Sequence, residues 1–597
     1  MIMNVKQLSI QVKIVFVSIT LLMSCTEDFE QINVNSNKVS DASAEELFAG
    51  SVLNTLNLVG GTLNDQLFNN YASYYGGKGG QFPRFFYLES SLDSYWRTFY
   101  VDILKNNQLI IDNYSDNTDY KNRVLIAKIW RSYVFSILVS TFGPVPYTDA
   151  INGLKNPTYG SEELIYTGVL EDLKEAGENI DLDGDSLLQD PVFNGDLLKW
   201  IKFANTLRLK IALRISDEDD DGHQQGFPDL AQLHGSEVMQ NESLLLTSND
   251  DNIALKWEAN AENWSYNYNR YVFLQPNEDV LPYVNFHFLL NLKTYHDPRL
   301  FKIIEPSSNP IIVRDRVYAS GSDSELIYVE YELPYFGRPL GGNNIIQAWG
   351  LNGDANPLAG IETRRYCRPK ADVFMAQDMS FYISTFAELN FLKAEAKLYG
   401  WGGAESAEEY YYKGIEASFE QYEVGGVDEY KNQAGIKWDT VSNGDRGLFN
   451  LVSSGISDDR LDQIVRQRWL SSFNQGHDMW TLHRRTRLLP IIDHFNPDGA
   501  TGLDFAPIPE RMIYPPIIEV ASNNENFELA IANLTESISS SHPSGNSLYS
   551  RLKTNKQYVP IDWPIYGDPS FKIDFITNFY GNSEDDLINA GITYIKL

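Results

Sequence analysis

The stretch from Phe381 to Tyr422, FYISTFAELNFLKAEAKLYGWGGAESAEEYYYKGIEASFEQY, decides the fold more clearly than any other part of the chain. Apolar residues recur at helical spacing through its first half, which predicts a helix with one largely apolar face. Gly400 ends this helix, because glycine readily adopts the left-handed conformation found at helix C-termini. Ser406 and Glu409 form a capping box at the start of the next helix. The stretch therefore predicts two helices back to back with a tight turn between them.

Helical periodicity and capping residues recur on both sides of this hairpin. Further helices are expected over residues 45–58, 66–75, 93–114, 123–142, 161–178, 196–215, 285–295, 460–483 and 523–537. Residues 123–142 are apolar over most of their length, but Lys128 and Arg131 argue against a membrane span, so a buried helix is expected there. The predicted fold class is mainly α, with tetratricopeptide-like helical hairpins forming a scaffold.

The N-terminus has the pattern of a targeting signal. Two lysines precede a short apolar run, and a small residue stands directly before Cys25. This pattern resembles a bacterial lipoprotein signal over residues 1–24, after whose removal the Cys25 thiol is acylated; the alternative is an ordinary signal peptide with a chance cysteine. Residues 25–41 then form a flexible tether. With Cys25 acylated, Cys367 has no partner for a disulfide and is expected to be a small packed residue.

Residues 42–597 are expected to form one domain. The helical scaffold occupies mainly residues 42–216 and 378–537. Between them, residues 217–377 lose their periodicity and are rich in Pro, Gly, Asn and Asp, which predicts a loop-rich lobe with few short strands. Residues 538–597 are expected to form an irregular tail.

The charge balance narrows the classes of partner. The 597 residues include 80 acidic and 48 basic side chains, for a net charge of −32, which argues against binding to nucleic acid. Two acidic stretches, beginning at Asp181 and Asp217, each match part of a calcium loop, but neither completes the ligand set, so solvated acidic loops are expected. No metal site and no cofactor is predicted, and no catalytic signature is present, although a pair of carboxylates at glycosidase distance cannot be identified from sequence.

Residues 483–487, HRRTR, form a basic cluster in this acidic chain. One interpretation is an anion site. The preferred interpretation is that these side chains bind backbone carbonyls and carboxylates at a helix C-terminus.

Aromatic residues in the less regular segments are the best functional signal. They alternate with Ser and Asn in NWSYNYNRY, flank the glycine-rich loop after residue 75, and occur beside Gly and Asn near residue 349. Flat rings bind the CH face of a sugar while neighbouring polar groups bind its hydroxyls. The alternative for NWSYNYNRY is a half-buried strand. The candidate ligand-binding residues are Tyr74, Tyr75, Trp264, Tyr266, Tyr268 and Trp349.

Several blocks spread over the chain resemble the SusD/RagB family of nutrient-binding outer-membrane lipoproteins. They are CTEDFEQINVNSN, FGPVPYTDAI, GDLLKWIKFANTLRLKIALRIS, HDPRL, FAELNFLKAEAKLYGW, YYKGIEASFEQY, RQRWLSSFNQGHDMWTLHRRTRL and IPERMIYPPIIEVASNNENF. The acidic insertion after residue 215 and the long tail depart from the family pattern. The resemblance implies an outer-membrane lipoprotein, facing the cell exterior, that captures oligosaccharide or another nutrient and closes over a SusC-like TonB-dependent barrel transporter.

The leading hypothesis is therefore a non-catalytic surface binding protein. The alternatives are a lipid-anchored glycan hydrolase and a scaffold that binds only protein. The sequence does not name the ligand, and peptide cargo remains an alternative to glycan.

Overall fold

The computed structural model describes residues 42–78, 89–151, 157–216, 226–260, 263–274, 281–308, 311–318, 326–333, 335–338, 366–433, 435–439, 459–489, 494–495, 505–515, 524–540, 543–558 and 594–596. The described part is mostly helical, and its strands are short and pair in groups of two or three. The predicted fold class is confirmed.

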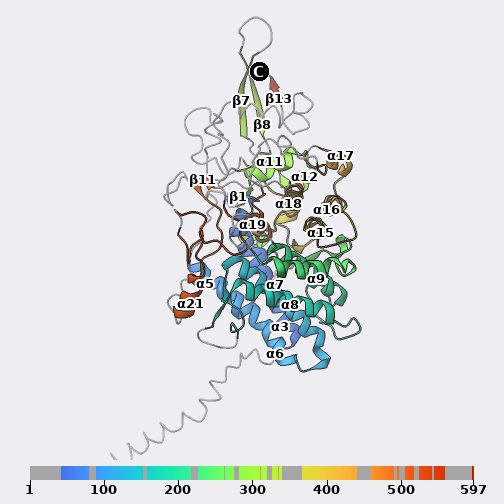
Figure 1. Ribbon diagram of the computed structural model, residues 1–597. Helices are drawn as coiled ribbons and strands as arrows, with labels where there is room; N and C mark the ends of the chain where they lie inside the picture. Colours follow the sequence, from blue (N-terminus) through green and yellow to red (C-terminus); the bar gives the residue numbers. More distant parts are fainter. Residues whose placement is uncertain are drawn as a thin grey trace, which may run out of the picture.

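The N-terminal helices form one end of the molecule, opposite the end that carries strands β7, β8 and β13 (Figure 1). From α6 onward, helices that follow one another in sequence lie beside each other in space, as expected for helical hairpins. Their bounds are α3 Ala44–Thr55, η2 Leu56–Phe68, α4 Asn69–Tyr71, α5 Glu89–Arg97, η3 Thr98–Leu104, α6 Lys105–Tyr114, α7 Lys121–Phe142, α8 Glu162–Asn179, α9 Leu197–Arg214 and α10 Pro228–Met239.

Helix α7 lies inside this stack. A segment from Thr118 to Phe142 is long and apolar enough to cross a membrane, but 89% of its most apolar stretch is buried within the fold. It contacts α6, α8 and α9. The prediction of a buried helix here is confirmed.

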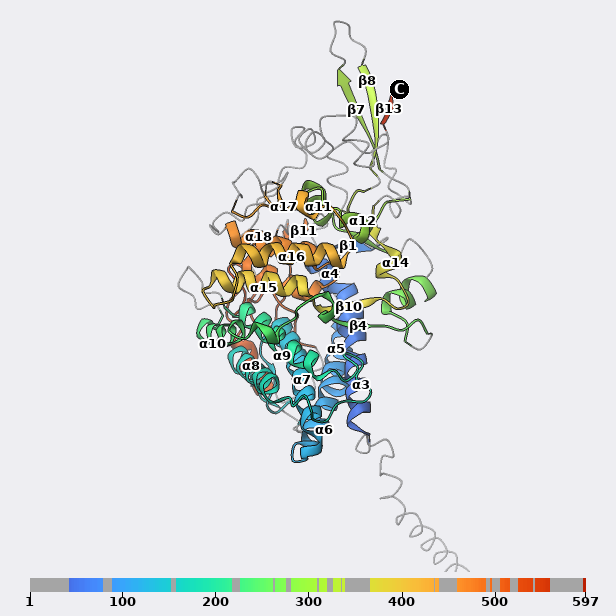
Figure 2. The ribbon, with the colours of Figure 1, turned by 90° about the vertical axis from the view of Figure 1, so that its right-hand side faces the viewer.

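Helices α15 to α19 lie beside this stack in the middle of the molecule (Figure 2), whereas α21 lies at its edge (Figure 1). Their bounds are α15 Phe386–Leu398, α16 Ala407–Gln421, α17 Val427–Lys431, α18 Asp459–Ser471, α19 Gly476–Thr486 and α21 Asn524–Ala532. The predicted hairpin is α15 and α16. Gly400 adopts a φ of +75°, and Ser406 and Glu409 form the capping box. A Cβ at Gly414 would lie 2.6 Å from the Phe391 ring, so glycine is what lets the two helices approach.

The region predicted to be a loop-rich lobe contains more helix than expected. Helix α11 Phe286–Thr294 matches the predicted helix 285–295, but α10 also lies in this region and was not predicted. Its other elements are α12 Leu300–Ile303, α14 Ala371–Phe374, β4 Ile253–Lys256, β5 Pro282–Val284, β6 Ile304–Glu305, β7 Ile311–Tyr318, β8 Leu326–Leu333 and β9 Arg368–Pro369.

Most strands join segments that are distant in sequence. Antiparallel pairs link β1 Tyr75–Lys78 with β5, β4 with β10 Ser380–Ser384, and β6 with β9. At the far end of the molecule, β13 Tyr594–Lys596 adds to the β7–β8 hairpin (Figure 1). The pair β4–β10 brings the lobe against the start of α15.

Candidate functional site

The aromatic segment, residues 263–274, is attached to the rest of the fold by its small polar side chains. Ser265 Oγ donates a hydrogen bond to the carbonyl of Ala376 (2.6 Å), and Asn267 Nδ2 donates to the carbonyl of Phe374 (2.9 Å). The neighbouring aromatic residues Trp264, Tyr266 and Tyr268 are only half-buried. Burial does alternate along NWSYNYNRY, but with the polar residues inside, and residues 263–267 form no strand. The half-buried strand considered as an alternative is therefore wrong.

Three rings of this segment contact one another. The ring of Trp264 lies 5.1 Å from that of Tyr268 and 5.0 Å from that of Phe273. The wider helical turn η7, Tyr268–Leu274, carries the last two rings, and Phe273 is 57% exposed. The structure thus brings Trp264 and Tyr268 together beside an exposed ring.

Tyr266 faces helix η2 instead. A Cβ at Gly61 would lie 2.8 Å from Tyr266 Cβ, so the ring stands directly on the glycine backbone. Its hydroxyl accepts hydrogen bonds from Gln66 Nε2 (3.3 Å) and Arg270 Nη1 (3.2 Å). Burial, together with the nearby Asp65 carboxylate, raises the pKa of Tyr266. Tyr266 therefore helps to hold the segment in place.

A buried hydrogen bond completes this attachment. The Tyr271 hydroxyl donates to both carboxylate oxygens of Asp65, at 2.7 and 2.8 Å. Burial, and then the charge of Asp65, raise the pKa of Tyr271 well above its usual value, so the phenol stays protonated as a donor.

Tyr74 and Tyr75 lie in the core. Tyr74 is fully buried, its hydroxyl donates to the carbonyl of Trp469 (2.7 Å), and its ring stacks on Trp469 and meets Phe288 edge to face. Tyr75 is 1% exposed and pairs with Val284 through β1. In this structure neither ring presents a face to solvent. Trp349 and Cys25 lie outside the described residues.

A cavity of about 400 Å³ lies on the other side of the chain segment that Ser265 and Asn267 hold. It opens between β10, the segment after α14, the C-terminus of α16 and the turn from α18 to α19. Its lining consists of Lys256, Lys302, Asp372, Val373, Phe374, Ala376, Asp378, Met379, Ser380, Tyr382, Gln421, Tyr422, Glu423, Phe473, Asn474 and Gln475. Sequence reasoning proposed none of these residues as ligand contacts.

The cavity has an apolar floor and a charged rim. Phe374, Met379 and Phe473 are buried, and the first and last meet edge to face with ring centres 4.9 Å apart. At the rim, Lys256 is 63% exposed and bonds to Asp378, which is 49% exposed, at 3.1 Å. Hydrogen bonds from Lys256 lower the pKa of Asp378. The volume lies within the range of small-molecule sites, roughly 300–1,000 Å³.

Beneath the cavity lies the charge cluster, which consists of Lys210, Arg214, Glu388, Arg468 and Asp478. Lys210 Nζ lies 2.5 Å from Asp478 Oδ2 and 3.1 Å from Glu388 Oε2. Arg468 Nη2 bonds to Glu388 at 2.7 Å, and Arg214 Nη2 to Asp478 at 3.2 Å. The cluster thus joins α9 of the N-terminal stack to α15, α18 and α19.

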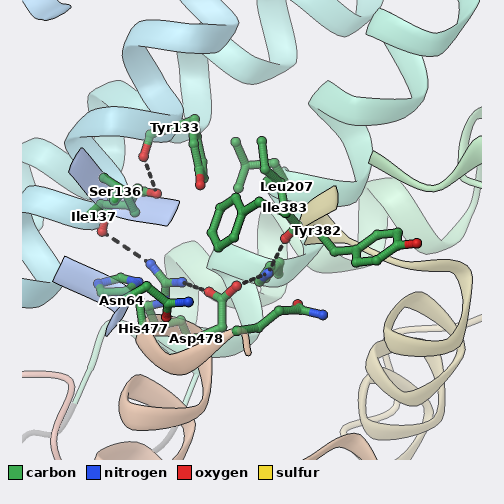
Figure 3. Close-up of a pocket in the computed structure, with 14 residues that line it drawn as sticks. Asn64, Tyr133, Ser136, Ile137, Leu207, Tyr382, Ile383, His477 and Asp478 are labelled. Atoms are coloured by element: carbon green, nitrogen blue, oxygen red, sulfur yellow. Dashed lines mark hydrogen bonds and ion pairs between the residues drawn. The ribbon is translucent and has the colours of Figure 1, made fainter. Parts of the chain in front are cut away.

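Figure 3 shows Asp478 at the centre of this interior, with Tyr382 on one side and Ser136 and Ile137 on the other. Burial alone would raise the pKa of Asp478, but Lys210 and the neighbouring arginine outweigh it and lower that pKa. An inner cavity of about 20 Å³ adjoins the cluster, which is room for about one water molecule. Tyr382 and Gln475 line both this inner cavity and the larger one.

The basic cluster at residues 483–487 is structural, as the preferred interpretation predicted. Arg485 Nη2 bonds to Glu395 at 2.5 Å and Arg487 Nη2 to Glu510 at 2.7 Å. Arg484 donates to the carbonyl of Ser140 at 2.8 Å. These side chains are buried and join α19 to its neighbours.

The acidic stretch at residues 181–185 also serves the fold. Asp185 accepts hydrogen bonds from the backbone amides of Asn122 (2.8 Å) and Arg123 (3.1 Å), at the first turn of α7. Residues 217–225 lie outside the described part. Among the residues that the structure describes, no group of three or more His, Cys, Asp or Glu is placed to hold a metal ion.

Two family models match the chain, one after the other. The first is described as "Starch-binding associating with outer membrane" and matches residues 36–329. The second is described as "Susd and RagB outer membrane lipoprotein" and matches residues 355–543. No curated protein matches the sequence significantly.

Solved structures of SusD homologues share the fold. A chitin-binding SusD homologue from Flavobacterium johnsoniae is 18% identical with a TM-score of 0.64, over 86% of this chain and 99% of that one. A SusD homologue from Bacteroides thetaiotaomicron is 20% identical with a TM-score of 0.62, over 87% and 100%. A third structure, of a chitin-binding protein, is 22% identical with a TM-score of 0.64, over 86% and 100%. At these identities the likeness establishes the fold, and together with the two family models it shows that the chain belongs to the SusD/RagB family of outer-membrane lipoproteins.

Proposed function

We propose that this protein is a non-catalytic, lipid-anchored receptor that captures oligosaccharide at the cell surface and delivers it to a SusC-like TonB-dependent barrel transporter. The family description of starch binding over residues 36–329 supports a glycan ligand, as do the two structural relatives described as chitin-binding. The signal over residues 1–24 and the tether over residues 25–41 would attach the chain to the outer membrane through Cys25.

The observation that carries the glycan proposal is the geometry of the aromatic segment. Trp264 and Tyr268 are held together but remain half-exposed, next to the exposed Phe273. Their backbone is fixed from behind by the buried Ser265 and Asn267. Rings fixed in this way lose little conformational freedom when a sugar stacks on them.

Glycan binding is tested by titration calorimetry with maltohexaose and chitohexaose. Trp264→Ala or Tyr268→Ala should weaken binding about 2- to 13-fold, because stacking on an aromatic ring contributes about 0.5–1.5 kcal/mol beyond the area it buries. Tyr114→Ala is the matched control: Tyr114 is a half-exposed ring stacked 4.4 Å from Tyr120, at the far end of the helical stack. Unchanged affinity in both segment variants would remove these rings from the site, and binding of peptides alone would overturn the glycan ligand.

The non-catalytic role is tested on the same samples. Incubation with either hexaose should release no new reducing ends. Turnover that disappears on substitution of one carboxylate would establish the glycan hydrolase instead. A stable complex with the transporter and no ligand in any screen would favour the protein-only scaffold.

The anchor and the partner have their own tests. Cys25→Ala should move the protein from the membrane fraction to the soluble fraction, and full retention would contradict lipidation.

Affinity purification of the wild-type protein from its own outer membrane should recover a TonB-dependent barrel, and its absence would contradict the delivery step.

A further inference from the structure

Gln475 is a buried polar side chain without a partner. It is 5% exposed, its Oε1 accepts no hydrogen bond, and no described residue bonds to its amide nitrogen. It is the residue before α19, yet its side chain makes no capping bond to that helix. Buried amides in folded proteins are normally paired, so this one is available to a group that enters from the cavity it lines.

The backbone that carries Gln475 is held firmly. Asn64 of η2 donates to the carbonyl of Asn474 (2.7 Å) and accepts from the amide of Gly476 (3.0 Å). Asn69 donates to Asn474 Oδ1 (2.8 Å), and Asn474 itself has a φ of +71°. The residues on both sides are thus fixed by hydrogen bonds, while the side chain between them has none.

Other polar groups of the cavity are unpaired as well. Among the described residues, the Tyr382 and Tyr422 hydroxyls and the Lys302 ammonium have no hydrogen-bond or ion-pair partner, although all three side chains line the cavity. Burial raises the pKa of both tyrosines, so the phenols remain neutral donors and acceptors. With the apolar floor below them, these groups match a molecule that has hydroxyls on its edges and an apolar face.

The charges at the rim argue for a neutral ligand. The lining has two lysines, Lys256 and Lys302, and three carboxylates, Asp372, Asp378 and Glu423, and one pair of opposite charges is already bonded. Asp372 also lies within ion-pair distance of Lys370, at 3.9 Å. Among the described residues, an anionic sugar would therefore meet the unpaired Glu423 carboxylate, and a cationic one the unpaired Lys302 ammonium.

The cavity is separate from the aromatic segment. None of residues 263–274 lines it, and the segment from Phe374 to Met379 forms the wall between the two. Figure 2 shows α14, β10 and β4 beside one another on the same side of the molecule.

We infer that this cavity is a second ligand site, which binds the terminal mono- or disaccharide unit of a neutral glycan through Gln475, Tyr382 and Tyr422. This inference rests on the proposed glycan function and adds a site that receives the end of the glycan. The aromatic segment would stack on rings anywhere along a glycan, whereas a cavity of about 400 Å³ lined by the buried Gln475 would receive an end.

The test uses the full chain in detergent with maltose and N,N′-diacetylchitobiose as probes, and their hexaoses for comparison. Gln475→Met keeps the length of the side chain and removes the amide, and Tyr382→Phe removes only a hydroxyl. Either change should weaken disaccharide binding about 3- to 10-fold, the effect of one hydrogen bond. Neither should lower the melting temperature, because neither removes a hydrogen bond within the protein.

Two further variants separate this inference from the proposed function. Trp264→Ala should weaken hexaose binding and leave disaccharide binding unchanged. Gln467→Met alters a buried glutamine that is fully paired, so it should lower the melting temperature and leave disaccharide affinity unchanged.

The outcomes are distinct. Disaccharide binding that is weakened by Gln475→Met and Tyr382→Phe, with stability retained, supports the cavity site. Glycan binding that these two variants leave at wild-type affinity overturns the cavity site and leaves the proposed function standing. No binding of any of the four sugars overturns both.

Discussion

The charge cluster and the cavity above it differ in whether their buried polar groups have hydrogen-bond partners. In the charge cluster, Glu388 is fully buried and both of its oxygens are bonded, to Arg468 on one side and to Lys210 and Ser384 on the other. In the cavity, Gln475 is almost as deeply buried and has no partner. Paired groups such as Glu388 hold helices of the scaffold together, whereas the unpaired Gln475 amide is the group that we propose a ligand binds.

The largest expected effect comes from breaking the charge cluster. Glu388→Ala removes the carboxylate that lies between Lys210 and Arg468 and leaves both cations with less compensation. Removing one partner of a buried ion pair costs about 3–5 kcal/mol. The free energy of unfolding, measured by urea denaturation, should fall by this amount.

Glu416→Ala is the control for this loss. Glu416 pairs with Lys431 at 2.5 Å, but its side chain is 48% exposed, and surface pairs contribute about 0–1 kcal/mol. Equal losses in the two variants would show that the charge cluster is no more important to the fold than a surface pair.

Two buried glutamines give the next largest contrast. Gln467 accepts from Arg299 Nη2 (3.2 Å) and donates to the Tyr430 hydroxyl (3.0 Å). Gln467→Met removes both of these buried hydrogen bonds and should lower the free energy of unfolding by about 1–3 kcal/mol. Gln475→Met should leave it unchanged or raise it. Equal losses from the two changes would mean that Gln475 has a structural partner.

The sequence predicts the scaffold far better than it predicts this contrast. Gly400, Ser406 and Glu409 act locally, so their roles in the α15–α16 hairpin follow from neighbours in the chain. The ion-pair partners in the charge cluster cannot be inferred from neighbours in the chain. Lys210 and Glu388 are 178 positions apart, and nothing local indicates which of the 80 acidic residues meets a given lysine.

The sequence also could not show which of the candidate aromatic rings are buried, because burial depends on contacts between distant segments. Alternation in NWSYNYNRY indicates that rings and polar residues face opposite ways, but it does not reveal that the polar face is the buried one, since that depends on the carbonyls of Phe374 and Ala376. Tyr74 and Tyr75 stand beside a glycine-rich loop in sequence, yet tertiary contacts bury both. A local sign of the cavity is Gln475, which stands directly before α19 at the position where Ser, Thr, Asp or Asn is the usual cap.

The stability of the scaffold should depend on pH through the buried ring of His287. Burial lowers the pKa of His287 to about 3, whereas an unfolded chain titrates near about 6.5. The folded state therefore keeps this ring neutral, and the unfolded state gains a proton as the pH falls below 6.5. Stability should fall with decreasing pH through this window, by about 1.4 kcal/mol per pH unit for this group.

The measurement compares the unfolding free energies of wild type and His287→Gln at pH 6.5, 5.5 and 4.5. Burial also lowers the pKa of His477 and His483, and Glu162, whose pKa burial raises to about 7, acts in the opposite direction. These groups are common to both proteins, so the difference between the two curves isolates His287. Parallel curves would show that this ring is hydrated in the folded state.

The smallest effect on stability is expected at the aromatic segment. Phe273 is 57% exposed, and its ring lies 5.0 Å from that of Trp264. Phe273→Ser should therefore change the free energy of unfolding by no more than about 0.5 kcal/mol. Tyr266→Ala is the informative contrast, because it removes the ring that covers Gly61 and the acceptor for Gln66. That variant should lose measurably more stability although Tyr266 and Phe273 lie in the same aromatic segment, residues 263–274. If Phe273→Ser were the more destabilising of the two, the exposed rings would belong to the scaffold, and the distinction between paired interior and free surface would fail at the segment that we propose binds glycan.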